Sequence, residues 1–357
     1  MNNASDTAAA TLALYILTSS GSYSVFIVLA LLRGASPFIS SFAAFVAIGS
    51  CCAPNKLSIR LTFAAELPYT SAMTISQDKS TVIRPFPHLC CPLDGAGLTL
   101  NDKTWRCEHG HSFDVAKQGY VNLLPVQKKR SKDPGDSKAM VQARARFLAE
   151  GFYAPLAEAL AAAVLTQPVG ALLDAGCGEG YYLRHVLDAA NARDVACKAA
   201  ALDISKWAVQ AAAKRDPRVS WLVASNSSIP VPDHSIDTLL CVFGFPVESE
   251  FSRVLSADGR LIMVDPAPSH LHQLKQVIYD EVKEKPSNLP VSDTWTLVSE
   301  ERVTFGVELP SRELIHDLLA MTPHLYRASS AGRARAEALT SLTVTVDIWL
   351  RAFTPNV

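Results

Sequence analysis

Hydrophobic and polar positions follow a regular alternation over the second half of the chain. From about residue 169, short apolar runs of strand length are separated by longer segments with helical spacing. The runs are VGALLDA, KAAALD, VSWLVAS, IDTLLCVFGF and GRLIMVDP. Strands alternating with helices predict a parallel, doubly wound sheet that binds its ligand at the carboxyl ends of the strands.

A helix is predicted earlier in the chain, over about residues 137–150. A Pro-Gly turn precedes it, Asp136 or Ser137 supplies the N-cap, and Gly151 ends it. Apolar residues recur inside it near helical spacing, at Met140, Ala143, Phe147 and Leu148.

The first 80 residues differ in composition from the rest. They hold seven of the 67 charged residues, and their uncharged runs, 7–32 and 34–55, are each long enough for a membrane span. No basic segment precedes the first run, unlike in a signal peptide. Three interpretations stay open: a true start at Met73, a targeting or membrane segment, and a folded subdomain. We favour the first, because the sequence after Met73 reads as cytosolic.

Whole-chain composition excludes several classes of protein. Lys and Arg number 33 against 34 Asp and Glu in 357 residues, and 49% of residues are hydrophobic. The chain is therefore neither a disordered acidic protein nor a histone-like basic one. Eight cysteines show no spacing typical of small secreted domains, so disulfides are not expected.

The segment HLCCPLDGAGLTLNDKTWRCEHGHSFD predicts a small metal-binding module. A structural zinc site needs four converging ligands, commonly from two knuckles joined by a hairpin. The candidates, two from each knuckle, are Cys91 and Asp94, then Cys107 and His111. Asp94 stands where a second sulfur is expected, and Cys90 in a shifted register is an alternative. A metal-free hairpin module is the other interpretation.

A basic segment follows this module. Between Lys117 and Arg146, eight basic residues stand against two acidic ones, a local net charge of +6. Its densest part is Lys128, Lys129, Arg130 and Lys132. Such a density suits contacts with nucleic-acid phosphates, and a solvated basic linker is the alternative.

The segment LLDAGCGEGYY predicts a cofactor site. Gly176, Gly178 and Gly180 lie between a strand and a helix, where the backbone bends tightly and helix N–H groups meet a ligand. With Asp174 at the strand end, the pattern differs from the G-x-G-x-x-G of dinucleotide sites and is typical of S-adenosylmethionine-dependent methyltransferases. Asp203 ends the next strand, where an acid accepts ribose hydroxyls. A helix N-cap role for Asp203 is the alternative.

From about Cys91 onward, the sequence resembles the RlmA (RrmA) family of 23S rRNA guanine-N1 methyltransferases. HSFDVAKQGYVNLLPVQKKRSKDPGDS and ARFLAEGFYAPL are its most diagnostic segments, and LDISKWAVQAAAKR and PAPSHLHQLK also match. The resemblance implies an α/β, Rossmann-like class I S-adenosylmethionine-dependent methyltransferase domain with a small N-terminal zinc-finger-like β module. The expected parts are an apolar extension (1–72), the module (85–116), a basic connector and helix (117–157) and the methyltransferase domain (158–357).

The resemblance also implies roles for single residues. Zinc would be held by the four ligand candidates, with Asp94 replacing a family cysteine. The cofactor pocket would use the tyrosine of Y-x-P-L, the glycine turn and the histidine of P-x-P-x-H. Together with the two acids above, the predicted cofactor set is Tyr153, Asp174, Gly176, Gly178, Glu179, Gly180, Asp203 and His270.

The expected reaction is methyl transfer from S-adenosylmethionine to N1 of a guanine in a hairpin of 23S rRNA. The base must be exposed and lose its N1 proton. Asp265 and His270 are candidate acceptors by position only. A small-molecule methyltransferase of the same fold is the alternative, and a non-catalytic RNA-binding protein is a third. We expect a cytoplasmic protein with zinc, 23S rRNA as partner and no stable membrane partner. A homodimer stays open.

Overall fold

The computed structural model describes residues 82–129, 131–282 and 293–356, and the backbone of three strands nearer the N-terminus. Those strands pair antiparallel and form a sheet of their own: β1 (Ala10–Ser19), β2 (Ser22–Leu31) and β3 (Phe45–Cys51). The chain divides into two compact units, Met1–Gln77 and Asp78–Val357. Met73 lies outside the described residues, so the interpretation of it as the true start stays a prediction.

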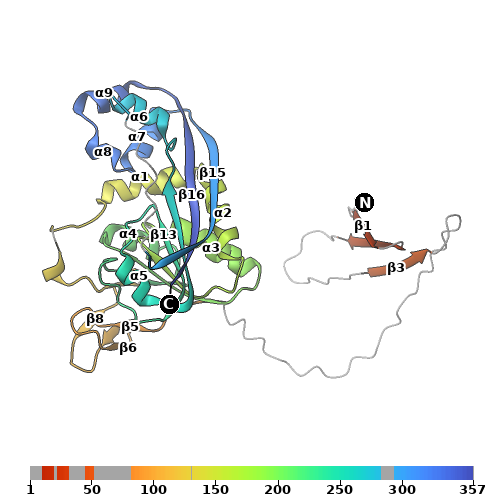
Figure 1. The fold of residues 1–357 in the computed structure, drawn as a ribbon, viewed down its shortest axis with the longest axis horizontal. Helices are drawn as coiled ribbons and strands as arrows, with labels where there is room; N and C mark the ends of the chain where they lie inside the picture. The colour runs from red at the N-terminus through yellow and green to blue at the C-terminus, as the bar shows by residue number, and fades with distance from the viewer. Residues whose placement is uncertain are drawn as a thin grey trace, which may run out of the picture. The chain divides into compact units, whose positions relative to one another are not determined.

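A nine-stranded sheet forms the centre of the second unit in the described residues (Figure 1). Its order is β15-β16-β14-β13-β10-β11-β12-β9, and β4 also pairs with β11. The bounds are β4 (Ile83–Pro85), β9 (Tyr120–Asn122), β10 (Gly170–Ala175), β11 (Cys197–Asp203), β12 (Ser220–Val223), β13 (Ile236–Val242), β14 (Leu255–Pro266), β15 (Trp295–Leu309) and β16 (Leu342–Pro355).

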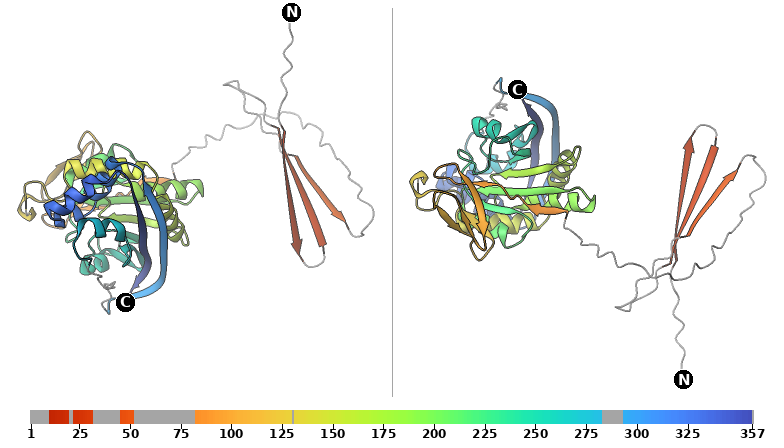
Figure 2. Two further views of the ribbon diagram at one scale, coloured as in Figure 1. Left: turned by 90° about the horizontal axis from the view of Figure 1, so that it is seen from above. Right: turned by 90° about the horizontal axis from the view of Figure 1, so that it is seen from below.

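The five apolar runs form the central strands β10 to β14, which pair in parallel as predicted. One edge differs from the prediction of a parallel sheet, because β16 pairs antiparallel with β14 and with β15. These two strands are long and curved (Figure 2). Central strands are apolar throughout because both faces are covered. In β10, Leu172 lies in one buried cluster and Leu173 in the other, as the alternation of side chains requires.

Helices complete the layers on the two faces of the sheet. The bounds are η1 (Val126–Lys128), α1 (Lys138–Ala149), α2 (Ala154–Val164), α3 (Tyr181–Ala192), α4 (Lys206–Ala213), α5 (Glu248–Val254), α6 (His272–Ile278), α7 (Arg312–Ala320), α8 (His324–Arg327) and α9 (Ser330–Ala338). The helix predicted over 137–150 is α1. The Ser137 hydroxyl caps it by accepting the Met140 N–H, and Gly151 follows with φ +80°.

Among the described residues, no single helix is long and apolar enough to cross a membrane. Only α1 and α2 taken together pass by length and composition, and they are bent by 87°.

The predicted metal-binding module is a small antiparallel sheet of order β5-β6-β7-β8 (the ribbon). Its strands are β5 (Leu89–Cys90), β6 (Gly97–Asn101), β7 (Thr104–Arg106) and β8 (Ser112–Asp114). Leu89, Leu98 and Trp105 are buried in the same cluster as Leu202 and Leu222 of the main sheet. The ribbon therefore shares a core with the main sheet.

Candidate active site

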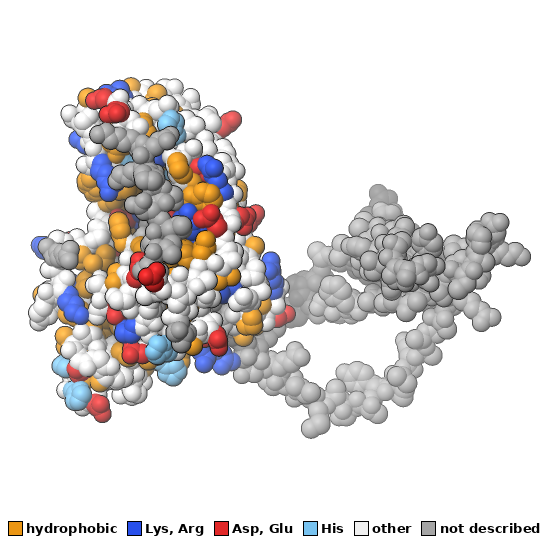
Figure 3. All heavy atoms as spheres, viewed as in Figure 1, with side chains coloured by type: hydrophobic (Ala, Val, Ile, Leu, Met, Phe, Trp, Pro, Cys, Tyr) orange, Lys and Arg blue, Asp and Glu red, His pale blue; other side chains and the backbone are white. Residues whose placement is uncertain are grey.

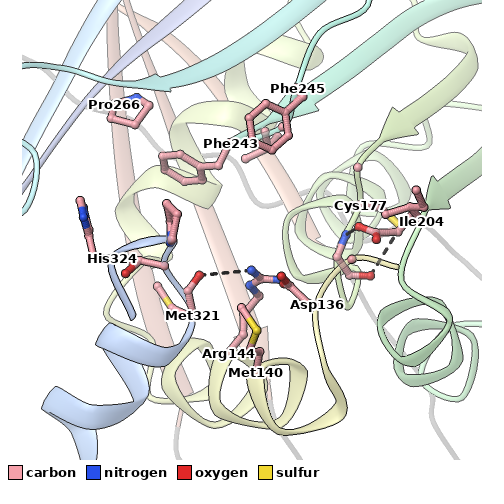
Figure 4. A pocket seen from close by; sticks show the side chains of 18 of the residues that line it. Asp136, Met140, Arg144, Cys177, Ile204, Phe243, Phe245, Pro266, Met321 and His324 are labelled. Atoms are coloured by element: carbon pink, nitrogen blue, oxygen red, sulfur yellow. Dashed lines mark hydrogen bonds and ion pairs between the residues drawn. The ribbon is translucent and has the colours of Figure 1, made fainter. Parts of the chain in front are cut away.

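A cleft of about 2060 Å³ opens at the carboxyl ends of the central strands. Its wall includes the glycine turn, part of the basic connector, the loops after β13 and β14, and residues of α1, α6 and α8. Figure 4 shows Phe243 and Phe245 on one side and Arg144, Met140 and Met321 on the other. Small-molecule pockets are commonly about 300–1,000 Å³, so this cleft has room for a cofactor and a second group.

The glycine turn after β10 bends through left-handed backbone. Gly176, Gly178 and Gly180 have φ of +92°, +56° and +77°. A Cβ on Gly180 would lie 2.7 Å from the Trp221 ring, whereas a Cβ on Gly178 would meet only the Arg144 side chain, at 3.4 Å. Gly180 is thus required by packing, and Gly178 leaves its backbone open to the cleft.

Asp174 lies at the end of β10 and is 2% exposed. Its Oδ1 is buried without a hydrogen-bond partner. Burial, together with the neighbouring Asp203, raises the pKa of Asp174 to about 7. A buried carboxyl with a spare oxygen beside a cleft is suited to pair with a cationic group of a ligand.

Asp203 holds the turn from the next strand. Its Oδ2 accepts the Gly178 N–H at 2.9 Å and its Oδ1 accepts the Ser205 N–H at 2.7 Å. Burial raises the pKa of Asp203, and these N–H groups oppose the rise. Ser205 is the N-cap of α4, so the N-cap alternative for Asp203 is wrong. Each carboxylate oxygen has a second lone pair, which stays available to a ligand hydroxyl.

Glu179 and Tyr153 are both buried at the cleft wall. The Oε2 of Glu179 accepts hydrogen bonds from Arg215 at 2.9 Å and Arg184 at 3.2 Å, and Oε1 is buried without a partner. The Tyr153 ring packs edge-on against Phe147 and a ring of β15, and burial raises the pKa of its hydroxyl well above the ordinary range. Both side chains are therefore held rigidly.

His270 is buried and lines the cleft after β14. Its Nδ1 accepts the Asp347 N–H at 3.3 Å. Burial and then Lys275 lower the pKa of His270 to about 3, so the ring is neutral and its proton is assigned to Nε2. Nδ1 thus already accepts a hydrogen bond and Nε2 carries the ring proton, so neither nitrogen has a free lone pair. This argues against His270 as the acceptor of the guanine proton.

The basic connector does not present all its cations to solvent. Arg144 pairs with Asp136 at 2.6 Å, and Arg146 binds Asp317 through two bonds of 2.9 and 2.6 Å. The predicted RNA-binding lysines are less engaged: Lys128 donates to Ser228 at 3.0 Å and lines the cleft with Lys129, and Lys132 is exposed. Arg130 lies outside the described residues. The local charge of +6 therefore overstates the free positive surface.

The four predicted metal ligands come together in the ribbon. One atom each of Cys91, Asp94, Cys107 and His111 lies within 4.8 Å of all the others. Hydrogen bonds to the Ala96 N–H and to the Cys91 thiol hold the pKa of Asp94 well below its usual range, so its carboxylate is ionised. Cys90 is outside this group. Two sulfurs, one imidazole nitrogen and one carboxylate oxygen are a donor set that zinc accepts.

His109 is a fifth neighbour of this group. Its Nδ1 lies 3.0 Å from Asp94 Oδ2, and its side chain is more exposed than that of His111. Histidines are visible at the end of the molecule where the ribbon lies (Figure 3). The ribbon thus offers its metal-ligand group near the surface.

Sequence reasoning missed three cleft residues that stand out in the structure. Phe243 has φ +52° and stacks on His270 with ring centroids 5.8 Å apart. Phe245 is 84% exposed, and its carbonyl accepts the Asn226 amide at 3.0 Å. Arg144 lies against Gly178. The run FGFP after an apolar strand was the available signal for the two aromatics, whereas nothing in the basic connector distinguished Arg144.

Comparison with known families and proteins places both parts of the second unit. A family model described as RlmA, N-terminal, matches residues 89–132, and one described as a methyltransferase domain matches 172–259. A relative from Micromonospora griseorubida named "Putative 23S rRNA (guanine-N(1)-)-methyltransferase" is 33% identical over 296 residues, which cover 75% of this chain and 98% of the relative.

Two further relatives carry similar names. YxjB of Bacillus subtilis (strain 168), with the same description, is 32% identical over 273 residues, covering 72% of this chain and 94% of the relative. The 23S rRNA (guanine(748)-N(1))-methyltransferase of Streptomyces fradiae is 39% identical over 193 residues, covering 52% and 66%.

Proposed function

We propose a function from one premise: the chain belongs to the family of 23S rRNA (guanine-N1)-methyltransferases. It is a methyltransferase that transfers a methyl group from S-adenosylmethionine to N1 of a guanine in 23S rRNA, and we place that guanine in a hairpin. The observation that carries this function is the core that the ribbon shares with the main sheet, together with the basic connector, which follows the ribbon and partly lines the cleft.

The residues at the glycine turn fit the cofactor. When bound, S-adenosylmethionine supplies a sulfonium methyl group as the electrophile. The spare oxygen of Asp174 would pair with the ammonium group, and Asp203 would accept the ribose hydroxyls. The Nε2–H of His270 would donate to an acceptor on the methionine part. Tyr153, Gly176, Gly178, Glu179 and Gly180 would shape the surrounding wall.

The protein must also accept a proton during the reaction. N1 forms a bond to the methyl carbon as the carbon–sulfur bond breaks, the bonding pair stays on sulfur, and S-adenosylhomocysteine leaves. We assign the N1 proton to Asp265. It lines the cleft with a side chain 27% exposed, while its Oδ2 is buried without a hydrogen-bond partner, 4.0 Å from Arg351. Burial raises the pKa of Asp265, which strengthens it as a base.

Recognition of the base and of its backbone would fall to different groups. The exposed ring of Phe245 offers an aromatic face on which an extruded guanine can stack. Lys128, Lys129, Arg130 and Lys132 would contact phosphates of the 23S rRNA. Since ribosomal RNA is the substrate, we propose a cytoplasmic site of action.

Zinc would be held by Cys91, Asp94, Cys107 and His111, joining the two knuckles of the ribbon. Metal analysis of the purified protein should find about one zinc per chain. Asp94→Cys should retain zinc against a chelator longer than the wild type, and Asp94→Ala should lose it sooner. Equal retention in all three proteins would contradict the assignment.

The direct test uses naked 23S rRNA, S-adenosylmethionine and two purified proteins, the full chain and the chain beginning at Met73. Nucleoside mass spectrometry should detect new 1-methylguanosine, and primer extension should stop at one guanine. If neither protein modifies RNA while both bind the cofactor, the small-molecule alternative gains support. If only the full chain is active, the first 72 residues take part in the function.

A further inference from the structure

One part of the cleft, formed by α6 and α8, holds cationic side chains that the roles above do not use. Lys275 lies on α6, and Tyr279 is the C-cap residue of that helix, with its N–H donating to the Lys275 carbonyl at 2.9 Å. The Tyr279 hydroxyl lies 2.8 Å from His324 Nδ1, and Arg327 follows His324 by one turn of α8. All four residues line the cleft.

Lys275 and Arg327 bring positive charge to this part of the cleft, whose lining also includes the exposed acid Glu281. Burial lowers the pKa of Lys275, and burial followed by Lys275 and Arg327 lowers the pKa of His324 to about 4. Asp347 is the acid that acts on Lys275, but its carboxylate binds Arg302 through two bonds of 2.8 Å. The negative charge of Asp347 is therefore already balanced by Arg302.

Neither Lys275 nor Arg327 makes a hydrogen bond or an ion pair with another side chain in the part of the chain that the structure describes. A half-buried ammonium group without a counter-ion is costly, and an anion that enters the cleft would remove that cost. If the Tyr279 hydroxyl donates to Nδ1, the Nε2–H of His324 is a further donor.

We infer that Lys275, Arg327 and His324 form an oxyanion-binding subsite of the cleft. The inference rests on the proposed function, which supplies two candidate sources of the anion. One is a phosphodiester of the RNA next to the target base, and the other is the carboxylate of the methionine part of the cofactor. Both present oxygens that Lys and Arg bind with charge-assisted hydrogen bonds.

The test compares the full-length wild type with Lys275→Gln, Arg327→Gln and a matched control, Arg312→Gln. Arg312 is an exposed cation on α7 outside the cleft, so its loss changes net charge equally. Circular dichroism and thermal melting check that each variant is folded. Three dissociation constants are then measured: for S-adenosylmethionine, for 5′-methylthioadenosine, which lacks the amino-acid part, and for a 23S rRNA hairpin over a salt series.

Each source of the anion gives its own result. A cofactor carboxylate predicts that Lys275→Gln weakens S-adenosylmethionine about tenfold and leaves 5′-methylthioadenosine unchanged. An RNA phosphate predicts unchanged cofactor binding, weaker RNA binding, and a slope of log affinity against log salt shallower by about 0.7–0.9 per lost contact.

The subsite is overturned if both cleft variants match Arg312→Gln for all three ligands. Because every readout is binding, failure of the proposed function would appear separately, as absence of 1-methylguanosine with the wild type.

Discussion

The glycine turn and the basic connector border the same cleft but are built differently. In the turn, three glycines adopt left-handed backbone, and both oxygens of Asp203 accept backbone N–H groups. In the connector, Lys128 and Lys132 are exposed, and the Lys128 ammonium donates to the hydroxyl of Ser228. A cofactor of fixed shape suits a wall fixed by the backbone, whereas a flexible polyanion suits cations on mobile side chains. We therefore expect single substitutions in the turn to have large effects on stability or cofactor binding. In the connector, we expect several substitutions together to be needed for a comparable effect on RNA binding.

The largest effect is expected from Gly180→Ala. The new methyl group would meet the Trp221 ring at 2.7 Å in left-handed backbone, so unfolding free energy should fall by about 2–4 kcal/mol. Gly178→Ala is the control, because only the flexible Arg144 side chain lies near, and about 1 kcal/mol is expected. Denaturant titration measures both. Equal stability of the two variants would contradict a packing role specific to Gly180.

Asp174→Asn should weaken S-adenosylmethionine binding about 10- to 100-fold, because a charged partner of the ammonium group is lost. The ammonium group needs the ionised carboxyl, whose pKa is about 7, so wild-type affinity should fall as pH decreases below 7. The variant should lose this dependence. Calorimetry between pH 5.5 and 7 measures both, and a parallel fall in the two proteins would remove Asp174 from the cofactor site.

Neutralising the connector with Lys128→Gln, Lys129→Gln and Lys132→Gln should weaken RNA binding about tenfold at moderate salt and make the salt slope shallower by about 2. Cofactor affinity should not change. A matched control replaces Arg193, Lys198 and Lys214, three exposed cations outside both the cleft and the ribbon. If both triple variants lose the same affinity, the connector has no special role and only total charge matters.

The smallest effect is expected from Phe245→Ala, about 1 kcal/mol or fivefold in RNA affinity, because stacking on one base is lost. Phe245→Tyr keeps the aromatic face and should behave as the wild type, while Phe245→Leu should resemble Ala. Filter binding measures the affinity for the hairpin. In a separate measurement, the fluorescence of a hairpin with 2-aminopurine at the target position reports exposure of the base. Full affinity with Leu would mean that bulk, not aromaticity, is what counts.

Much of the fold could be predicted because local signals and tertiary packing agree. The five apolar runs form parallel strands. Ser137 and Gly151 mark the two ends of α1, as expected for an N-cap serine and a glycine that follows a helix. The antiparallel edge was not predicted, because β15 carries mostly exposed positions and lacks the apolar run of a central strand. Its pairing is decided by β16, which is far along the chain.

The positions of candidate residues could be predicted where their chemistry is read locally and were missed where long-range pairing decides, and their roles stay predictions. Asp174 and Asp203 follow strands, and the four ribbon ligands converge as their spacing suggests. The charge count of the connector could not reveal that Arg146 is tied to Asp317, which lies 171 residues away. Likewise, the Asp347 N–H that decides the proton position of His270 belongs to the last strand.

The ribbon is enclosed between two strands of the main sheet. β4, which precedes it, pairs with β11, and β9, which follows it, pairs with β12. The chain on both sides of the ribbon is thus part of the main sheet, unlike a zinc finger joined to its neighbour by a flexible linker. If a hairpin of 23S rRNA contacts both the ribbon and the cleft, the distance between these two contacts is fixed by the protein. Adding or removing one base pair between those contacts should therefore displace the target guanine from the cleft, because the strands on both sides of the ribbon are paired with the main sheet.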